Sequence, residues 1–193
     1  MKRMLNIFMV LLLAASTVLP AFAADTPSVR QNGAPTVIEV SDKAAEVFVV
    51  PLMEKDKASW QVRQELDTSV EALHEGDLTQ VQAVQDAVKA LNEQRVLGEE
   101  QAPAEIKAED LVVSEVFYVS ATEKNLTVTF EVEGIKAGQF LMVMVFVNGE
   151  WVVLDADSVR ILEDGKVCVA FREYGPVAFA VNKNEVAAAV AAK

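Results

Sequence analysis

Residues 140–147 form an unbroken run of apolar side chains, and this run constrains the fold more than any other segment. In an extended strand, successive side chains point to opposite faces of the sheet. One face of such a strand carries Phe140, Met142, Met144 and Phe146, and the other carries Leu141, Val143, Val145 and Val147. A sandwich of two sheets buries only one face of each sheet. We therefore expect a second sheet to cover one side of this strand and further elements to cover the other.

The surrounding sequence predicts short strands that would supply the second sheet. Residues 126–133 alternate apolar and polar side chains, which is typical of a strand with one buried face. Asn148-Gly149 is the preferred two-residue hairpin turn, because both residues tolerate a positive φ. Further apolar runs bounded by turn residues stand at 151–154, 159–162, 167–171 and 177–181. This spacing predicts an antiparallel β-sandwich over residues 108–184.

Two stretches with helical spacing would supply the cover on the other side. Their apolar side chains recur at steps of three or four, at Val62, Leu66, Val70 and Leu73, and at Leu78, Val81, Val84, Val88 and Leu91. Gly76 and Asp77 mark a short turn between the stretches, so we expect two antiparallel helices. We predict that this helical hairpin packs on the outer face of the sheet that contains residues 140–147, which makes the chain one cooperative unit.

The predicted fold class is therefore α+β, with a helical hairpin packed on a C-terminal antiparallel β-sandwich. Two short strands are expected near residues 36–40 and 45–51, where β-branched side chains are dense. Along the chain we expect a signal peptide at 1–23, a flexible leader at 24–35, the two short strands and the helical hairpin at 36–97, an acidic linker at 98–107, the sandwich at 108–184 and a tail at 185–193.

The first 23 residues have the order of a cleavable secretory signal. The basic pair Lys2-Arg3 precedes an apolar run over residues 4–19, and Pro20 and the small-residue sequence Ala21–Ala23 follow. A membrane-spanning helix needs roughly 20 apolar residues, and this run is shorter. We expect a protein that is secreted or associated with the cell envelope, with no membrane span after cleavage.

The net charge of the chain argues against two classes of binding partner. The formal net charge is −12, and cleavage after residue 23 removes two basic and no acidic side chains, which makes it −14. Such a charge excludes nucleic acid as the expected partner, because nucleic-acid binding depends on clustered Lys and Arg. It also disfavours anionic lipid surfaces. Cys168 is the only cysteine, so an intrachain disulfide is excluded.

Three segments of the C-terminal half carry a resemblance. They are the strand and turn at 126–138, the hairpin Val147-Asn148-Gly149-Glu150-Trp151, and the closing strand at 175–181. In this order and spacing they resemble a β-sandwich module of exported surface proteins of Gram-positive anaerobes, over roughly residues 108–184. Gly175 stands where that family often has Ser. The resemblance implies a structural or interaction role at the envelope, and it does not extend to the N-terminal half.

Acidic and aromatic residues supply the candidate sites. Asp155, Asp157 and Asp164 cluster around a predicted turn and are candidate calcium ligands, although their spacing is not that of an EF-hand and solvated loop carboxylates are the alternative. Trp60 and Trp151 are candidate contacts for a ligand or partner, for example as a sugar platform. For Trp151 the alternative is a structural anchor beside the hairpin turn.

The remaining reactive side chains carry no catalytic motif. His74 is the only histidine, and a lone histidine without cysteine ligands does not predict a zinc site. Cys168 lies in a predicted strand between two valines, which favours a buried, inert thiol over a nucleophile paired with His74. We assign no catalytic residue and no cofactor.

The leading functional prediction is a secreted, non-enzymatic interaction or structural module that acts outside the cell or at the envelope. Its unknown partner is expected to be a protein or a glycan at the cell surface. Two alternatives remain open at this point. One is an extracellular hydrolase that uses two carboxylates. The other is a small-ligand-binding or inhibitory protein whose site lies between the helices and the sheet.

Overall fold

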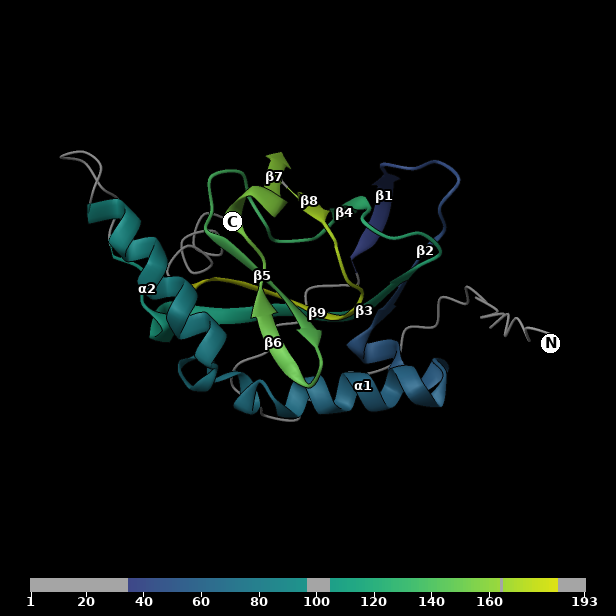
Figure 1. Cartoon of the computed structure of the whole chain (residues 1–193), viewed down its shortest axis with the longest axis horizontal. Coiled ribbons are helices and arrows are strands. Elements are labelled where there is room, and N and C mark those ends of the chain that lie inside the picture. The colour runs from purple at the N-terminus through teal and green to yellow at the C-terminus, as the bar shows by residue number, and fades with distance from the viewer. Residues whose placement is uncertain (1–34, 97–104, 164, 184–193) are drawn as a thin grey trace, which may run out of the picture.

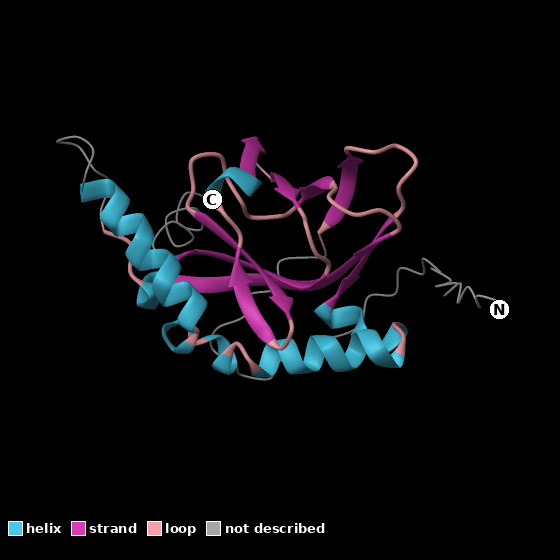
Figure 2. Cartoon of the chain, in the orientation of Figure 1, coloured by secondary structure: helices cyan, strands magenta, loops and turns pink. Residues whose placement is uncertain are grey.

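The computed structural model describes residues 35–96, 105–163 and 165–183, and these residues form an α+β protein (Figures 1 and 2). Its helices are η1 (Leu52–Lys57), α1 (Trp60–Glu71), η2 (His74–Gly76), η3 (Leu78–Gln80), α2 (Gln82–Val96), η4 (Ala108–Asp110) and η5 (Ala156–Ser158). Its strands are β1 (Thr36–Val40), β2 (Val47–Pro51), β3 (Leu111–Ala121), β4 (Thr127–Glu131), β5 (Leu141–Val147), β6 (Glu150–Val153), β7 (Val159–Glu163), β8 (Lys166–Ala170) and β9 (Gly175–Asn182). The predicted α+β class is confirmed.

The strands form two antiparallel sheets. The four-stranded sheet has the order β1-β4-β8-β7, and the five-stranded sheet has the order β2-β3-β9-β5-β6. Strands β5 and β6 form the predicted hairpin, in which Val147 lies opposite Glu150. Asn148 and Gly149 have φ values of 53° and 88° at its turn, as the Asn-Gly sequence predicts. The last strand, β9, lies in the middle of its sheet, between β3 and β5.

Side chains from both sheets share one hydrophobic core. Phe117 of β3 is at its centre, with ring centroids 5.5 Å from Phe130 of β4 and 5.1 Å from Phe179 of β9. Val143 and Val145 of β5 enter the same core and are buried. One face of the apolar strand at residues 140–147 is thus covered by the four-stranded sheet.

A second hydrophobic core covers the other face of β5. Met142 and Met144 are buried there with apolar residues from the helical segment, and Trp151 of β6 joins them. The helical contributors are Leu66, Leu73, Leu78, Val81, Val84 and Val88. Residues of the helical segment thus cover this face of β5, which explains why both faces of the strand are apolar.

The two α-helices do not lie side by side as the predicted antiparallel hairpin requires. In Figure 1, α1 runs beneath the five-stranded sheet and α2 turns away along its flank. Residues 72–81 connect them, and His74, Glu75 and Gly76 all have positive φ. Leu73 and Leu78 within the connection are buried against the sheet. The connection is therefore part of the core, and its packing directs α2 away from α1.

The two N-terminal strands complete the sheets. Strand β1 pairs with β4, with Val37 opposite Phe130, and β2 pairs with β3, with Val49 opposite Val119. The sequence predicts one segment, residues 36–97, that contains both these strands and the helices. In the structure each strand instead forms one edge of a different sheet, so the sheets draw on both halves of the chain.

The side chain of Asn92 connects helix α2 to the start of the C-terminal half through two hydrogen bonds. The Asn92 amide donates to the Ile106 carbonyl oxygen at 2.7 Å and accepts from the Ile106 N–H at 3.2 Å. Ile106 itself is buried in the core beneath the helices. The end of the predicted acidic linker is thus held in place.

Several predicted features lie outside the described residues. They are the signal peptide at 1–23, the leader up to residue 34, residues 98–104 of the linker, Asp164 and the tail from residue 184. None of the helices in the described residues is both long enough and apolar enough to cross a membrane.

Candidate functional site

Among the described residues, the most exposed large apolar side chains lie on two consecutive elements. Met53 in η1 has 73% of its surface exposed, and Trp60 at the start of α1 has 69%. Elements η1 and α1 pack against each other. Exposed apolar area marks a binding surface when it adjoins a groove or a larger patch, whereas single exposed apolar side chains are common. Because Trp60 also borders an open groove formed by both elements, we take η1 and α1 as the candidate functional site.

The local sequence fixes the position of Trp60. The Ala58 N–H donates to the Lys55 carbonyl oxygen at 3.0 Å, which closes η1. The Ser59 hydroxyl then accepts from the Val62 N–H at 3.3 Å, which is the usual bond of a serine helix cap. Trp60 is the next residue, so its backbone belongs to the first turn of α1.

An open groove of about 540 Å³ lies beside Trp60. We call it the α1 groove, and it is lined by Lys55, Asp56, Trp60, Arg63, Gln64, Asp67, Thr68 and Glu71. Its α1 residues recur at steps of three or four and so share one face of the helix. The opposite face carries Leu66 and Ser69, which are buried against the sheet. The amphipathic period of α1 thus separates the groove from the core.

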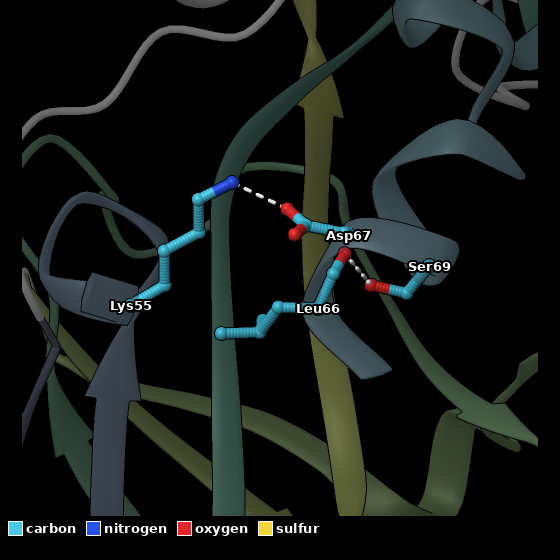
Figure 3. A network of polar contacts seen from close by, with 4 residues as sticks. All are labelled: Lys55, Leu66, Asp67 and Ser69. Atoms are coloured by element: carbon cyan, nitrogen blue, oxygen red, sulfur yellow. Dashed lines mark hydrogen bonds and ion pairs between the residues drawn. The ribbon is translucent and has the colours of Figure 1, made fainter. Parts of the chain in front are cut away.

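An ion pair holds the two walls of the α1 groove together. The Lys55 ammonium of η1 contacts the Asp67 carboxylate of α1, as Figure 3 shows. On the buried side of the same helix, the Ser69 hydroxyl donates to the Leu66 carbonyl oxygen at 2.8 Å. The ion pair therefore links η1 to α1, whereas the Ser69–Leu66 bond lies within α1 itself.

The α1 groove is polar apart from Trp60. Two cations and three carboxylates line it, together with the amide of Gln64 and the hydroxyl of Thr68. The Arg63 Nε is buried and has no hydrogen-bond partner among the described residues. A ligand with one flat apolar face can stack on the Trp60 ring and form hydrogen bonds with the polar side chains around it.

Trp151, the second aromatic candidate, is not available as a platform. Only 5% of its surface is exposed, and its ring packs against Phe146 at a centroid distance of 5.3 Å. Its Nε1 donates to the Ser69 carbonyl oxygen at 2.9 Å. Its burial, ring contact and hydrogen bond are those of a structural anchor beside the hairpin turn.

The calcium candidates do not form a ligand group in the described residues. Asp155 and Asp157 are exposed at η5, and Asp164 lies outside the described residues. In the part of the chain that the structure describes, no three His, Cys, Asp or Glu side chains gather closely enough to hold a metal ion.

His74 and Cys168 belong to different parts of the molecule. His74 lies in the connection between the helices, on the outer side of the five-stranded sheet. Cys168 lies on β8 of the four-stranded sheet, opposite Thr129 and Arg160. Its neighbours Val167 and Val169 point into the core between the sheets, so Cys168 points away from that core. The structure does not bring the two side chains together.

A second hollow, of about 420 Å³, lies between α2 and the sheet. Most of its lining is apolar, and Ala87 and Leu91 of α2 face Phe140, Met142 and Val153 across it. This is the region where the small-ligand alternative placed a site.

Comparison with known proteins finds no relative: no protein-family model, no curated protein and no solved structure matches this chain.

Sequence reasoning identified Trp60 but missed the polar residues beside it. Arg63, Gln64 and Thr68 follow Trp60 at helical spacing, so they form a polar stripe that begins at an aromatic residue. That stripe was a readable signal. The contribution of Lys55 and Asp56 had no such signal, because it depends on how η1 folds against α1.

Proposed function

We propose that this protein is a secreted, non-enzymatic interaction module that binds a partner outside the cell or at the envelope through Met53, Trp60 and the α1 groove. In this proposal the two sheets form a β-sandwich, and the helical segment is a layer on its outer face. The observation that carries the proposal is the exposure of Met53 and Trp60 on two elements that pack against each other and are joined by the Lys55–Asp67 ion pair. The signal-like N-terminus and the resemblance to surface-protein modules support an extracellular setting.

One of the three carboxylates of the α1 groove is engaged in an ion pair. A carboxylate-based hydrolase needs two carboxyl groups that flank the scissile bond. In the α1 groove the Asp67 carboxylate is engaged by Lys55 and ties η1 to α1. This carboxylate therefore has a positioning role in the groove.

The small-ligand alternative has one observation in its favour, which is the hollow beside α2. Its volume of about 420 Å³ lies within the range of small-molecule pockets. Binding there would be independent of Trp60, because none of the α1 groove residues lines this hollow. Variants of Trp60 therefore separate the two functions.

Co-sedimentation of the mature protein with purified Gram-positive cell walls tests the proposal. The double variant Met53→Ser, Trp60→Ala should raise the apparent dissociation constant at least about tenfold, which corresponds to roughly 1.4 kcal/mol. The matched control is Leu162→Ala, because Leu162 is also 55% exposed but lies on β7 of the four-stranded sheet. Equal binding by the double variant and the control would contradict the proposal, as would failure of the natural protein to sediment.

A further inference from the structure

We propose that the α1 groove is a binding site for a neutral glycan, in which the indole of Trp60 stacks on one face of a sugar ring. This inference rests on the proposed function and names the chemical class of its ligand. The juxtaposition that carries it is one highly exposed aromatic ring at the end of a groove whose other lining side chains are all polar.

The composition of the groove favours a sugar over an apolar segment of a protein. An apolar side chain or helix would need apolar walls on several sides. The α1 groove offers one apolar surface, the Trp60 ring, and polar groups elsewhere. A sugar ring matches this pattern, because it has an apolar C–H face and a rim of hydroxyl groups that both donate and accept hydrogen bonds.

The polar side chains supply both partners that sugar hydroxyls need. The carboxylates of Asp56 and Glu71 accept hydrogen bonds, and the guanidinium of Arg63 donates them. Gln64 and Thr68 can do both, and they lie on the same face of α1 as Trp60. The groove thus offers both donors and acceptors to the hydroxyl groups of a sugar that lies over the helix.

The charges specify a neutral sugar. Three carboxylates and two cations line the groove, and one carboxylate and one cation are engaged with each other. The whole chain carries a formal net charge of −12, which repels polyanions at long range. Uronate-rich or sulfated polysaccharides are therefore disfavoured, and an uncharged glycan is the expected ligand.

The groove is preorganised for such a ligand. Trp60 is held in the first helical turn by the Ser59 cap, and η1 is held to α1 by the Lys55–Asp67 ion pair. A rigid site loses little conformational entropy on binding. Since Trp60 has 69% of its surface exposed in the free protein, stacking would remove a large aromatic area from water.

Tryptophan fluorescence gives a direct test, because the chain has two Trp residues and only Trp60 is exposed. The probes are soluble β-1,4-linked hexasaccharides of glucose, N-acetylglucosamine, xylose and mannose, with oligogalacturonate as the anionic comparison. We expect at least one neutral sugar to shift the emission to the blue and to protect it from acrylamide quenching. Trp60→Phe removes the responding fluorophore and should abolish both effects, since Trp151 is buried.

Calorimetric titration of variants then locates the sugar in the groove. Gln64→Ala and Thr68→Ala should each weaken binding by about two- to tenfold, as expected for one lost hydrogen bond. The matched control is Gln61→Ala, which alters an exposed side chain on the same helix that does not line the groove. Trp60→Ala should abolish detectable binding, whereas Trp60→Phe should retain part of it. Equal affinities for all these variants would overturn the assignment.

The outcomes also separate this inference from the function on which it rests. If cell-wall binding depends on Trp60 but no neutral sugar alters its emission, the partner is not a neutral glycan and the interaction module stands. Preferential binding of oligogalacturonate would likewise overturn the glycan class. If neither cell walls nor sugars engage Trp60, both proposals are wrong.

Discussion

The indole Nε1 of Trp151 donates a hydrogen bond to the carbonyl oxygen of Ser69 at 2.9 Å, across 82 residues of sequence. Ser69 lies in the last turn of α1, where carbonyl oxygens lack N–H partners within the helix. The β5–β6 hairpin thus supplies a donor that α1 cannot supply for itself. The bond fixes the end of the helix that carries the α1 groove.

This hydrogen bond predicts that substitutions of the two tryptophans lower the free energy of unfolding by different amounts. Trp151→Phe leaves the buried Ser69 carbonyl without its donor and should lower the free energy of unfolding by about 1–3 kcal/mol. Trp60→Phe alters an exposed ring and should change it by less than about 0.5 kcal/mol. Urea unfolding of both variants checks the prediction. Similar losses for the two would show that Trp151 does not anchor α1.

A second prediction concerns Asn92, whose amide pairs with both polar backbone groups of Ile106. Asn92→Ala removes both hydrogen bonds and should destabilise the protein by about 1–3 kcal/mol. Asn92→Asp keeps the acceptor but places a carboxylate against the Ile106 carbonyl, so it should be no less destabilising. The control is Lys89→Ala on the exposed side of α2, expected within about 0.5 kcal/mol. Thermal unfolding measures all three, and an unaffected Asn92→Ala variant would contradict the prediction.

A third prediction addresses the cooperativity of the whole chain. A fragment of residues 108–184 lacks β1 and β2, and it lacks the helical cover over Met142 and Met144. We expect this fragment to aggregate or to bind a hydrophobic dye, because a large apolar surface is then exposed. Sedimentation and dye fluorescence provide the measurement. A monomeric fragment that unfolds cooperatively would mean that this region is an independent domain.

A fourth prediction follows from Tyr118 of β3, which is half-buried on the side of the sheet that α1 covers. Burial, together with the charge of Glu65 and its hydrogen bond with the phenol, raises the pKa of Tyr118 to about 12. In the unfolded chain the pKa is about 10, so the folded protein holds this proton more tightly. The associated stability is fully present below pH 10 and is lost as the pH rises from about 10 to about 12.

The variant Tyr118→Phe should therefore flatten the fall in unfolding free energy over this pH range. Glu65→Gln should move the phenol titration to lower pH without restoring the ordinary value, because burial remains the largest cause. Near-ultraviolet absorbance of phenolate follows the titration. A Tyr118 that ionises at its ordinary pKa in the folded protein would contradict the assignment.

Local patterns predicted the parts of the fold that depend on neighbouring residues. The two apolar faces of residues 140–147 require two covers, and the structure supplies them as Val143 in one core and Met144 in the other. Asn148-Gly149 determines its own turn, because few other residue pairs adopt two successive positive φ angles.

The arrangement of the helices depends on information that is not local. The predicted end of the first helix at Gly76 is wrong, because α1 ends at Glu71 and Gly76 closes the short η2. The direction of α2 follows from burial of Leu73 and Leu78 against the sheet. Likewise, β1 and β2 were recognised as strands, whereas their placement in two different sheets depends on pairing with β4 and β3. The sequence of an edge strand does not identify the strand with which it pairs.

The candidate site shows the same division. Trp60 and Trp151 are the same residue type, and each follows shortly after a turn or bend in the chain. Tertiary packing leaves the first exposed and buries the second. The helical spacing of the α1 groove residues was readable, but the ion pair between Lys55 and Asp67 required the fold of η1.

The central place of β9 has a consequence for how the polypeptide matures. Strands β3 and β5 are separated in the sheet by the segment Gly175–Asn182, which a ribosome makes after both of them. Until that segment emerges, each has one edge without a neighbour, and the sheet cannot close early. Pairing between strands so distant in sequence is also slow. The five-stranded sheet can therefore be completed only once β9 has been synthesised, and we expect its β2-β3 and β5-β6 pairs to join late in folding.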